Sequence, residues 1–73
     1  MNNTSWVDTI YAQNELDHNG ELRDLDLLIN KTLKVPDKSV IKNCVFRAGP
    51  DLGDKPFLIL NDYCSIHNVQ TIQ

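Results

Sequence analysis

The chain has 73 residues, of which 41% are hydrophobic, so we expect one domain with a thin core rather than a disordered segment. The net charge of −3 and seven scattered basic residues argue against nucleic-acid binding, which needs a concentrated basic face. Neither a membrane-spanning apolar stretch nor a signal-peptide pattern is present in the sequence, so we expect a cytoplasmic protein, with association with a virion as the alternative.

The chain contains two cysteines, Cys44 and Cys64, which are too few for a disulfide framework. We expect both thiols to be reduced, as is usual in a cytosolic setting. Domains of this size usually need disulfides, a metal or a partner subunit for stability. The small size therefore favours self-association.

The first predicted element is a helix over residues 5–16. Ser5 can cap its start, and Asp8 stands three residues later in a variant of the capping box. Four large apolar residues follow at helical spacing, and we expect this stripe to be buried: Trp6, Val7, Ile10 and Tyr11. The Asp-His-Asn-Gly sequence at 17–20 predicts a break, either a turn or the C-cap of the helix, because Asn-Gly favours positive φ.

From Leu25 onward the apolar residues alternate with polar ones, which predicts strands with one buried face. The alternating apolar positions are Leu25, Leu27, Ile29, Leu33 and Val35. A helix over 21–34 remains the alternative, because a second set of apolar residues in this stretch also fits a period of 3.6.

Two proline-containing breaks divide the rest of the chain. Residues 36–38 predict a turn, and the glycine- and proline-rich segment 48–56 predicts a loop. Between and after them, residues 40–46, 57–60 and 65–72 predict three further strands. The continuous apolar run at 57–60 is typical of a fully buried strand.

The second half of the chain contains an internal repeat. Residues 33–46 align with 58–71 without a gap, and four of the fourteen positions are identical. The identical pairs are Leu33 with Leu58, Asp37 with Asp62, Ile41 with Ile66 and Asn43 with Asn68. The two copies are 25 residues apart, and about this many residues form one turn of a parallel β-solenoid. Neighbouring turns of a solenoid bury each other's apolar faces. Asparagines at the same corner of successive turns can hydrogen-bond to each other and tolerate left-handed geometry.

The segments 33–36 and 41–46 together resemble one rung of the right-handed parallel β-helix proteins, which include pectate-lyase-like enzymes and bacteriophage tailspikes. Residues 66–69 resemble the next rung, so that the resemblance extends over 33–72. The resemblance implies a parallel β-helix whose first turn is often capped by an N-terminal helix. It also implies carbohydrate contact along an outer face.

We therefore predict a single domain, 1–73, that is mainly β with one N-terminal helix. In the first interpretation the 5–16 helix is a lid on a short β-solenoid-like stack formed by 24–72. In the alternative, the fold is a compact α+β domain with the helix packed on a small sheet of three to five strands, some antiparallel. In the first interpretation the strand at 65–72 has an open edge, which is a template for a partner strand or a second copy.

The sequence contains no convincing catalytic or metal site. Cys64 and His67 have the spacing of half a metal site, but strand geometry points them to opposite faces and no second half is present. We therefore expect no metal and no cofactor. Asp37 and Asp62 would stack about 5 Å apart in a solenoid, as a carboxylate pair does in polysaccharide-cleaving enzymes. The competing interpretation is that both are turn residues that accept local amide hydrogen bonds.

The residues that we expect to bind a partner lie on one outer surface. Tyr63 follows a turn and is the best candidate for an exposed contact, and Lys42 and His67 share a column of the repeat. Asp37 and Asp62 complete this set. The function that the sequence favours is a non-catalytic binding or structural module, related to phage proteins, that acts through protein–protein association. The alternative is a small acidic regulatory protein that binds and inhibits a host protein.

Overall fold

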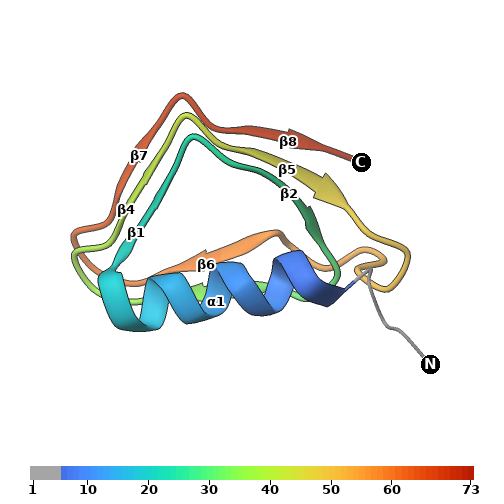
Figure 1. Ribbon diagram of the computed structural model, residues 1–73, viewed down its shortest axis with the longest axis horizontal. Helices are drawn as coiled ribbons and strands as arrows, with labels where there is room; N and C mark the ends of the chain where they lie inside the picture. Colours follow the sequence, from blue (N-terminus) through green and yellow to red (C-terminus); the bar gives the residue numbers. More distant parts are fainter. Residues whose placement is uncertain (1–5) are drawn as a thin grey trace.

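The computed structural model describes residues 6–73, which form one helix and eight short strands (Figure 1). The elements are α1 (Val7–Asn19), β1 (Glu21–Arg23), β2 (Asp26–Ile29), β3 (Leu33–Val35), β4 (Val40–Lys42), β5 (Val45–Ala48), β6 (Leu58–Leu60), β7 (Ser65–His67) and β8 (Gln70–Ile72). Strands predominate after the helix, and the predicted alternative of a helix over 21–34 is wrong because this stretch forms β1, β2 and β3.

The strands form three small parallel sheets, none of which closes on itself. Their orders are β1-β4-β7, β2-β5-β8 and β3-β6, and all five strand pairings in the described chain are parallel. The protein is therefore a small α+β protein with one helix. The antiparallel pairings that we expected with the compact α+β alternative do not occur among residues 6–73, because strands that follow each other in sequence lie in different sheets.

The strands are short because the chain bends at residues with left-handed backbone geometry. Asp24, Asn43 and Asn68 have φ values of 58°, 55° and 53° and stand at the bends between the first sheet and the second. Aspartate and asparagine adopt this geometry more readily than other non-glycine residues. Two runs that we predicted as single strands, 40–46 and 65–72, therefore each form two strands in different sheets.

The register of the strands agrees with the internal repeat. The chain passes through the sheets three times, first in β1 and β2, then in β3 to β5, and then in β6 to β8. Leu33 lies opposite Leu58, and Ile41 lies opposite Ile66, so the second and third passages are 25 residues apart. The first and second passages are only 19 residues apart, as Asp24 and Asn43 show. The longer second passage contains the loop between β5 and β6.

The core lies between the three sheets and the helix. It consists of inward-facing residues from the strands, together with residues from α1 and from the loop after β5: Ala12, Leu16, Leu22, Leu27, Ile29, Leu33, Val35, Ile41, Cys44, Phe46, Leu52 and Phe57. The prediction of a fully buried strand at 57–60 is wrong, since Ile59 and Leu60 are 52% and 48% exposed. The reason is that β6 is the last strand of a two-stranded sheet.

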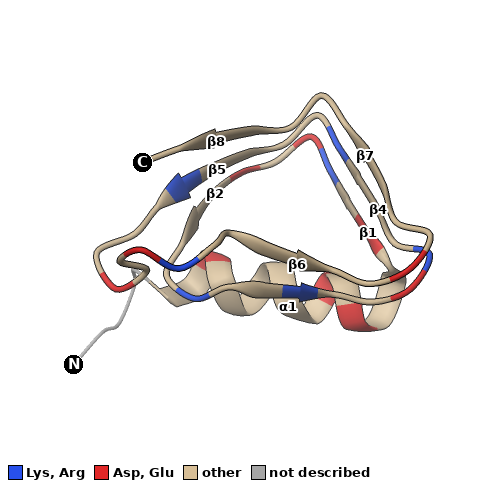
Figure 2. Cartoon of the chain, turned by 180° about the vertical axis from the view of Figure 1, so that it is seen from behind, with Lys and Arg blue, Asp and Glu red and all other residues tan. Residues whose placement is uncertain are grey.

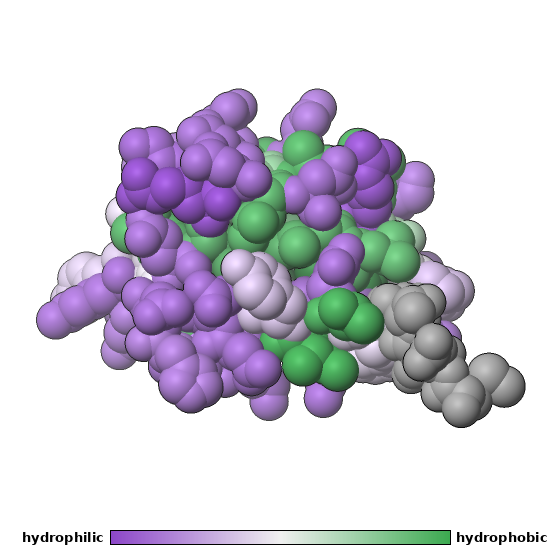
Figure 3. Space-filling model, in the orientation of Figure 1, coloured by the Kyte–Doolittle hydropathy of each residue, from purple (hydrophilic) through white to green (hydrophobic). Residues whose placement is uncertain are grey.

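The helix turns a different face to the core from the one we predicted. Val7, Ile10 and Tyr11 are exposed, whereas Thr9, Ala12 and Leu16 are buried. Figure 3 shows apolar side chains over the first turns of α1 and within the outline of the sheets above it, surrounded by polar side chains. Small and polar residues face inward because α1 lies close against the backbone of β2 and β3, which their side chains contact directly.

The two ends of the helix differ in how far they follow the prediction. Trp6 is the N-cap and makes no side-chain capping bond, while the predicted cap, Ser5, lies outside the described residues. Asp8 accepts a hydrogen bond from the backbone amide of Leu28. At the other end, the helix continues to Asn19, beyond the predicted end at 16. Gly20 has φ of 67° and donates its amide to the carbonyls of Glu15 and Leu16, so the Asn-Gly break is the C-cap of the helix.

Candidate functional site

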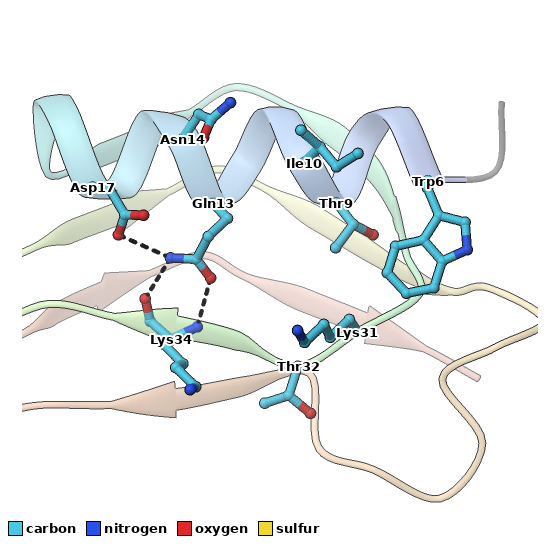
Figure 4. Close-up of a pocket in the computed structure, with 9 residues that line it drawn as sticks. All are labelled: Trp6, Thr9, Ile10, Gln13, Asn14, Asp17, Lys31, Thr32 and Lys34. Atoms are coloured by element: carbon cyan, nitrogen blue, oxygen red, sulfur yellow. Dashed lines mark hydrogen bonds between the residues drawn. The ribbon is translucent and has the colours of Figure 1, made fainter. Parts of the chain in front are cut away.

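The helix side of β3 is closed by the side chain of Gln13. Its Nε2 donates to the carbonyl of Lys34, and its Oε1 accepts from the amide of Lys34, both over 2.9 Å (Figure 4). The same Nε2 also donates to Asp17. The side-chain amide thus makes both bonds that a neighbouring strand would make to this residue, and no further strand can pair here.

The helix side of β2 is closed in the same way by two residues of α1. Asp8 Oδ2 accepts from the amide of Leu28 over 2.9 Å. Thr9 Oγ1 donates to the carbonyl of Leu28 and accepts from the amide of Asn30. Side chains of α1 therefore occupy backbone groups of β2 and β3, and we call this side of the molecule the closed end.

The opposite side of the molecule has no such cover among the described residues. The strands β6, β7 and β8 are each the last strand of their sheet, and we call the surface that they form the open end. Leu60 and Ile66 lie there opposite the buried Val35 and Ile41, yet they are 48% and 37% exposed. The open end therefore combines unpaired strand edges with half-exposed apolar side chains, a combination that favours the addition of another chain.

The open end also carries almost no charge. Residues 57–73 contain a single residue among Asp, Glu, Lys and Arg, which is Asp62. Figure 2 shows β6, β7 and β8 without acidic or basic residues, while charged residues mark the strands that pair with them and the loops. Edge strands of soluble proteins usually carry lysine or proline, which discourages pairing. The open end has neither.

The predicted binding residues lie beside the open end in two pairs. Asp37 and Asp62 come together through a bond of 3.0 Å, in which Asp37 Oδ1 accepts from the amide of Asp62. Lys42 and His67 lie opposite each other in the pairing of β4 with β7, and both are exposed. Tyr63 follows Asp62, is 82% exposed and has φ of 63°. Asp37 thus accepts an amide hydrogen bond, as we expected of a turn residue in the alternative to a carboxylate pair.

A ladder of side chains connects the three passages at one corner. Asn68 Nδ2 donates to Asn43 Oδ1 over 2.9 Å, and Asn43 Nδ2 donates to Asp24 Oδ1 over 3.2 Å. The asparagine pair at the repeated corner is confirmed, and the ladder extends to an aspartate in the first passage. It fixes the register of the last passage without any apolar burial.

Among residues 6–73 no group of three His, Cys, Asp or Glu side chains is arranged to hold a metal ion. Cys44 is buried, and Cys64 is half-buried with its Sγ donating to the carbonyl of Pro36 over 3.1 Å. A groove of about 480 Å³ lies between α1 and the segment 31–34 (Figure 4). Two of the polar side chains that line this groove are already paired within the chain: Gln13 bonds to Lys34, and Trp6 Nε1 donates to Asp51.

One ion pair lies on the outer face of the second sheet. Arg47 Nε and Nη2 donate to the two carboxylate oxygens of Asp26 over 2.9 and 3.1 Å. These hydrogen bonds and the positive charge of Arg47 lower the pKa of Asp26, and the carboxylate in turn raises the pKa of Arg47. Both side chains are half exposed, so this pair contributes little to stability.

The comparisons with known proteins return no relatives: no protein-family model, curated protein or solved structure matches the chain. In the part of the chain that the structure describes, no helix combines the length and the apolar character that are needed to cross a bilayer.

Proposed function

We propose that the protein is a non-catalytic binding module that associates with a protein partner through the open end. The observation that carries this proposal is the contrast between the two ends. Side chains of α1 occupy backbone groups of β2 and β3 at the closed end, whereas β6, β7 and β8 present their free edges together with half-exposed apolar residues. A surface that is both unpaired and apolar is typical of a docking site.

The backbone at the open end indicates the chemistry of the partner. The amides of Ser65 and Gln70 donate inward to the carbonyls of Ser39 and Cys44. Because amides alternate between the two sides of a parallel strand, those of Ile66 and Thr71 are directed outward. A partner that supplies a strand edge with carbonyl acceptors, beside an uncharged apolar surface, would satisfy both features.

We also propose that the three passages through the sheets are successive turns of a short parallel β-solenoid, as in the right-handed β-helix proteins. The strand order and the parallel register with offsets of 19 and 25 residues support this proposal. So does the ladder of Asp24, Asn43 and Asn68. In a solenoid each turn is a template for the next, and the open end is then the place where a further layer is added.

The proposal is tested by capture from an extract of the source cells with the tagged protein and two matched variants. Ile66→Lys places a charge at the open end, and Ile10→Lys places the same charge on the exposed face of α1, where Ile10 is 56% exposed. We expect the wild type and Ile10→Lys to retain the same partner protein and Ile66→Lys to lose it. An untagged copy of this chain counts as such a partner.

Circular dichroism of Ile66→Lys must match the wild type, and Thr71→Arg serves as the second open-end variant if it does not. Retention that is equal in the wild type and in a folded open-end variant would show that the contact lies elsewhere. The absence of any retained protein, including an untagged copy of the chain, would also contradict the proposal.

A further inference from the structure

We propose that the partner at the open end is a second copy of the same chain, and that two copies meet open end to open end in a closed dimer with two-fold symmetry. This inference rests on the proposed function, because it names the occupant of the same surface. It follows from three features of the molecule: the occupied backbone groups at the closed end, the near absence of charge at the open end and the direction of the strands.

The closed end excludes stacking of copies in a continuous column. Such a column would need the open end of one copy to pair with β1, β2 and β3 of the next. Gln13 already bonds both backbone groups of Lys34 in β3, and Asp8 and Thr9 bond those of Leu28 in β2. A head-to-tail contact that does not close would produce filaments. Two of the three strands that a column would have to pair are thus occupied, whereas all three strands of the open end remain for pairing, so association stops at two copies.

The lack of charge at the open end suits a self-complementary contact. In a two-fold interface each group meets the same surface of its twin, so any charge near the axis faces a like charge. Asp62 is the only charged side chain among Asp, Glu, Lys and Arg in residues 57–73. Since it lies at a turn and its backbone amide bonds to Asp37, it stands outside the strands that would meet. A partner recognised by charge would find no complementary group on these strands.

Two-fold symmetry also changes the direction of pairing at the junction. Within one copy all pairings are parallel. A two-fold axis perpendicular to the stack reverses the second copy, so the strands on the two sides of the junction run antiparallel. The outward amides of β7 and β8 would then donate to carbonyls of the twin, and Leu60 and Ile66 would be covered by the open end of the twin.

Sedimentation equilibrium of the purified full chain tests the inference, with Thr71→Pro and Thr71→Ala as a matched pair. Proline removes the outward amide of Thr71 and leaves the inward bond from Gln70 to Cys44 unchanged, whereas alanine retains the amide. We expect the wild type and Thr71→Ala to reach twice the chain mass of 8.3 kDa and to go no further. Thr71→Pro should raise the dissociation constant by about tenfold or more, because the symmetry removes two bonds.

Alkylation of Cys64 in the wild type gives a second measurement that needs no variant. Cys64 is half-buried and precedes β7, while Cys44 is fully buried. The rate at Cys64 should fall as the protein concentration rises, and it should fall before the rate at Cys44, whose alkylation requires the chain to unfold.

Each outcome separates the inference from the proposed function. A wild type that stays at the mass of one chain at the highest concentration, with a constant rate at Cys64, overturns the dimer. If the open-end variants still lose a different protein from the extract, the proposed function stands without it. Masses that grow beyond two chains would overturn the blocked closed end, and equal dissociation constants for Thr71→Pro and Thr71→Ala would place the junction away from β8.

Discussion

Gly49 is the glycine whose replacement the packing tolerates least. A Cβ built on it would clash with Oδ1 of Asn30, whose side chain is buried and accepts a hydrogen bond from the amide of Asp51. We expect Gly49→Ala to lower the free energy of unfolding by about 1–3 kcal/mol, because either the loop or the Asn30 side chain must move. Urea denaturation followed by circular dichroism measures this loss.

A double-mutant cycle with Asn30→Ala separates the clash from other effects at Gly49. If the clash with the Asn30 amide is the cause, Gly49→Ala costs much less stability in the Asn30→Ala background than in the wild type. Additive losses would instead show that the glycine is needed for a different reason. Gly53 offers no such contact, since a Cβ there would meet nothing within 4 Å.

The Asp26–Arg47 pair should be visible as a titration rather than as stability. The hydrogen bonds from Arg47 hold the pKa of Asp26 below its usual value of 3.8. A lowered folded-state pKa means that the contribution is present above the unfolded pKa and is lost as the pH falls through the folded one. We expect a carboxyl titration by NMR to show this low pKa, and Arg47→Gln or high salt to raise it.

The matched control for this titration is Lys42→Gln, which removes an exposed positive charge that does not touch Asp26 in the structure. It should leave the carboxyl titration of Asp26 almost unchanged. If Arg47→Gln and Lys42→Gln shift the pKa of Asp26 equally, the general charge of the protein rather than the bidentate pair is responsible.

At the scale of the elements, the contact between α1 and β3 depends on one side-chain amide. Gln13→Ala should expose both backbone groups of Lys34 to water, and we expect a loss of about 1–2 kcal/mol in the free energy of unfolding. Hydrogen exchange at the Lys34 amide should become faster. Gln13→Glu keeps an acceptor for that amide but sets a carboxylate oxygen against the Lys34 carbonyl. It should therefore accelerate the exchange at Lys34 less than Gln13→Ala does.

The exchange of the Leu28 amide is the internal control for both variants, because it bonds to Asp8 and not to Gln13. If exchange at Leu28 and Lys34 accelerates equally in Gln13→Ala, the whole helix has detached, and the effect is not local to β3.

The repeat predicted the arrangement of the strands better than it predicted their environment. Identical residues at Leu33 and Leu58 set the register correctly, because residues of one column must face the same side. The run at 57–60 was wrongly expected to be buried, since an apolar run does not indicate whether another strand follows in the sheet. The missed strand β1 (Glu21–Arg23) has a single buried apolar residue, Leu22, and three residues are too few to show a period.

The orientation of the helix was wrong because the large apolar residues were assumed to face the core. The side facing the strands instead carries Thr9, Ala12 and Leu16, with Gln13 beside them. A helix that lies directly against strand backbone needs small residues and polar groups that replace strand hydrogen bonds. Polar residues at positions 9 and 13, one turn apart, were the only signal of this, and hydrophobicity alone could not reveal it.

The positions of the predicted binding residues could be foreseen from the sequence, but the extent of the open end could not. The exposed Tyr63 and the column of Lys42 and His67 could be placed from the turn and the repeat. The closed end could not, because it depends on which backbone groups the side chains of α1 reach in three dimensions.

At the scale of the whole molecule, association predicts that stability depends on concentration. If the dimer forms only from folded chains, binding adds to the free energy of unfolding by mass action. We expect the midpoint of thermal unfolding of the wild type and of Thr71→Ala to rise between micromolar and millimolar protein. The midpoint of Thr71→Pro should rise less over the same range.

Differential scanning calorimetry at several concentrations provides this comparison. A midpoint that is independent of concentration in the wild type would mean that the folded chain gains nothing from a second copy under these conditions. A midpoint that rises equally for Thr71→Pro would show that the association does not use the outward amide of β8.

The order of the passages has a consequence for how the protein is made. The helix comes first in the chain, and its side chains occupy the edges of β2 and β3 as soon as these strands follow. Each later strand then pairs with a strand that has already been synthesised. The protein should therefore be able to fold progressively as it leaves the ribosome, without waiting for its C-terminus. The surface to which β7 and β8 contribute, after the other described strands, is the one that we propose for association.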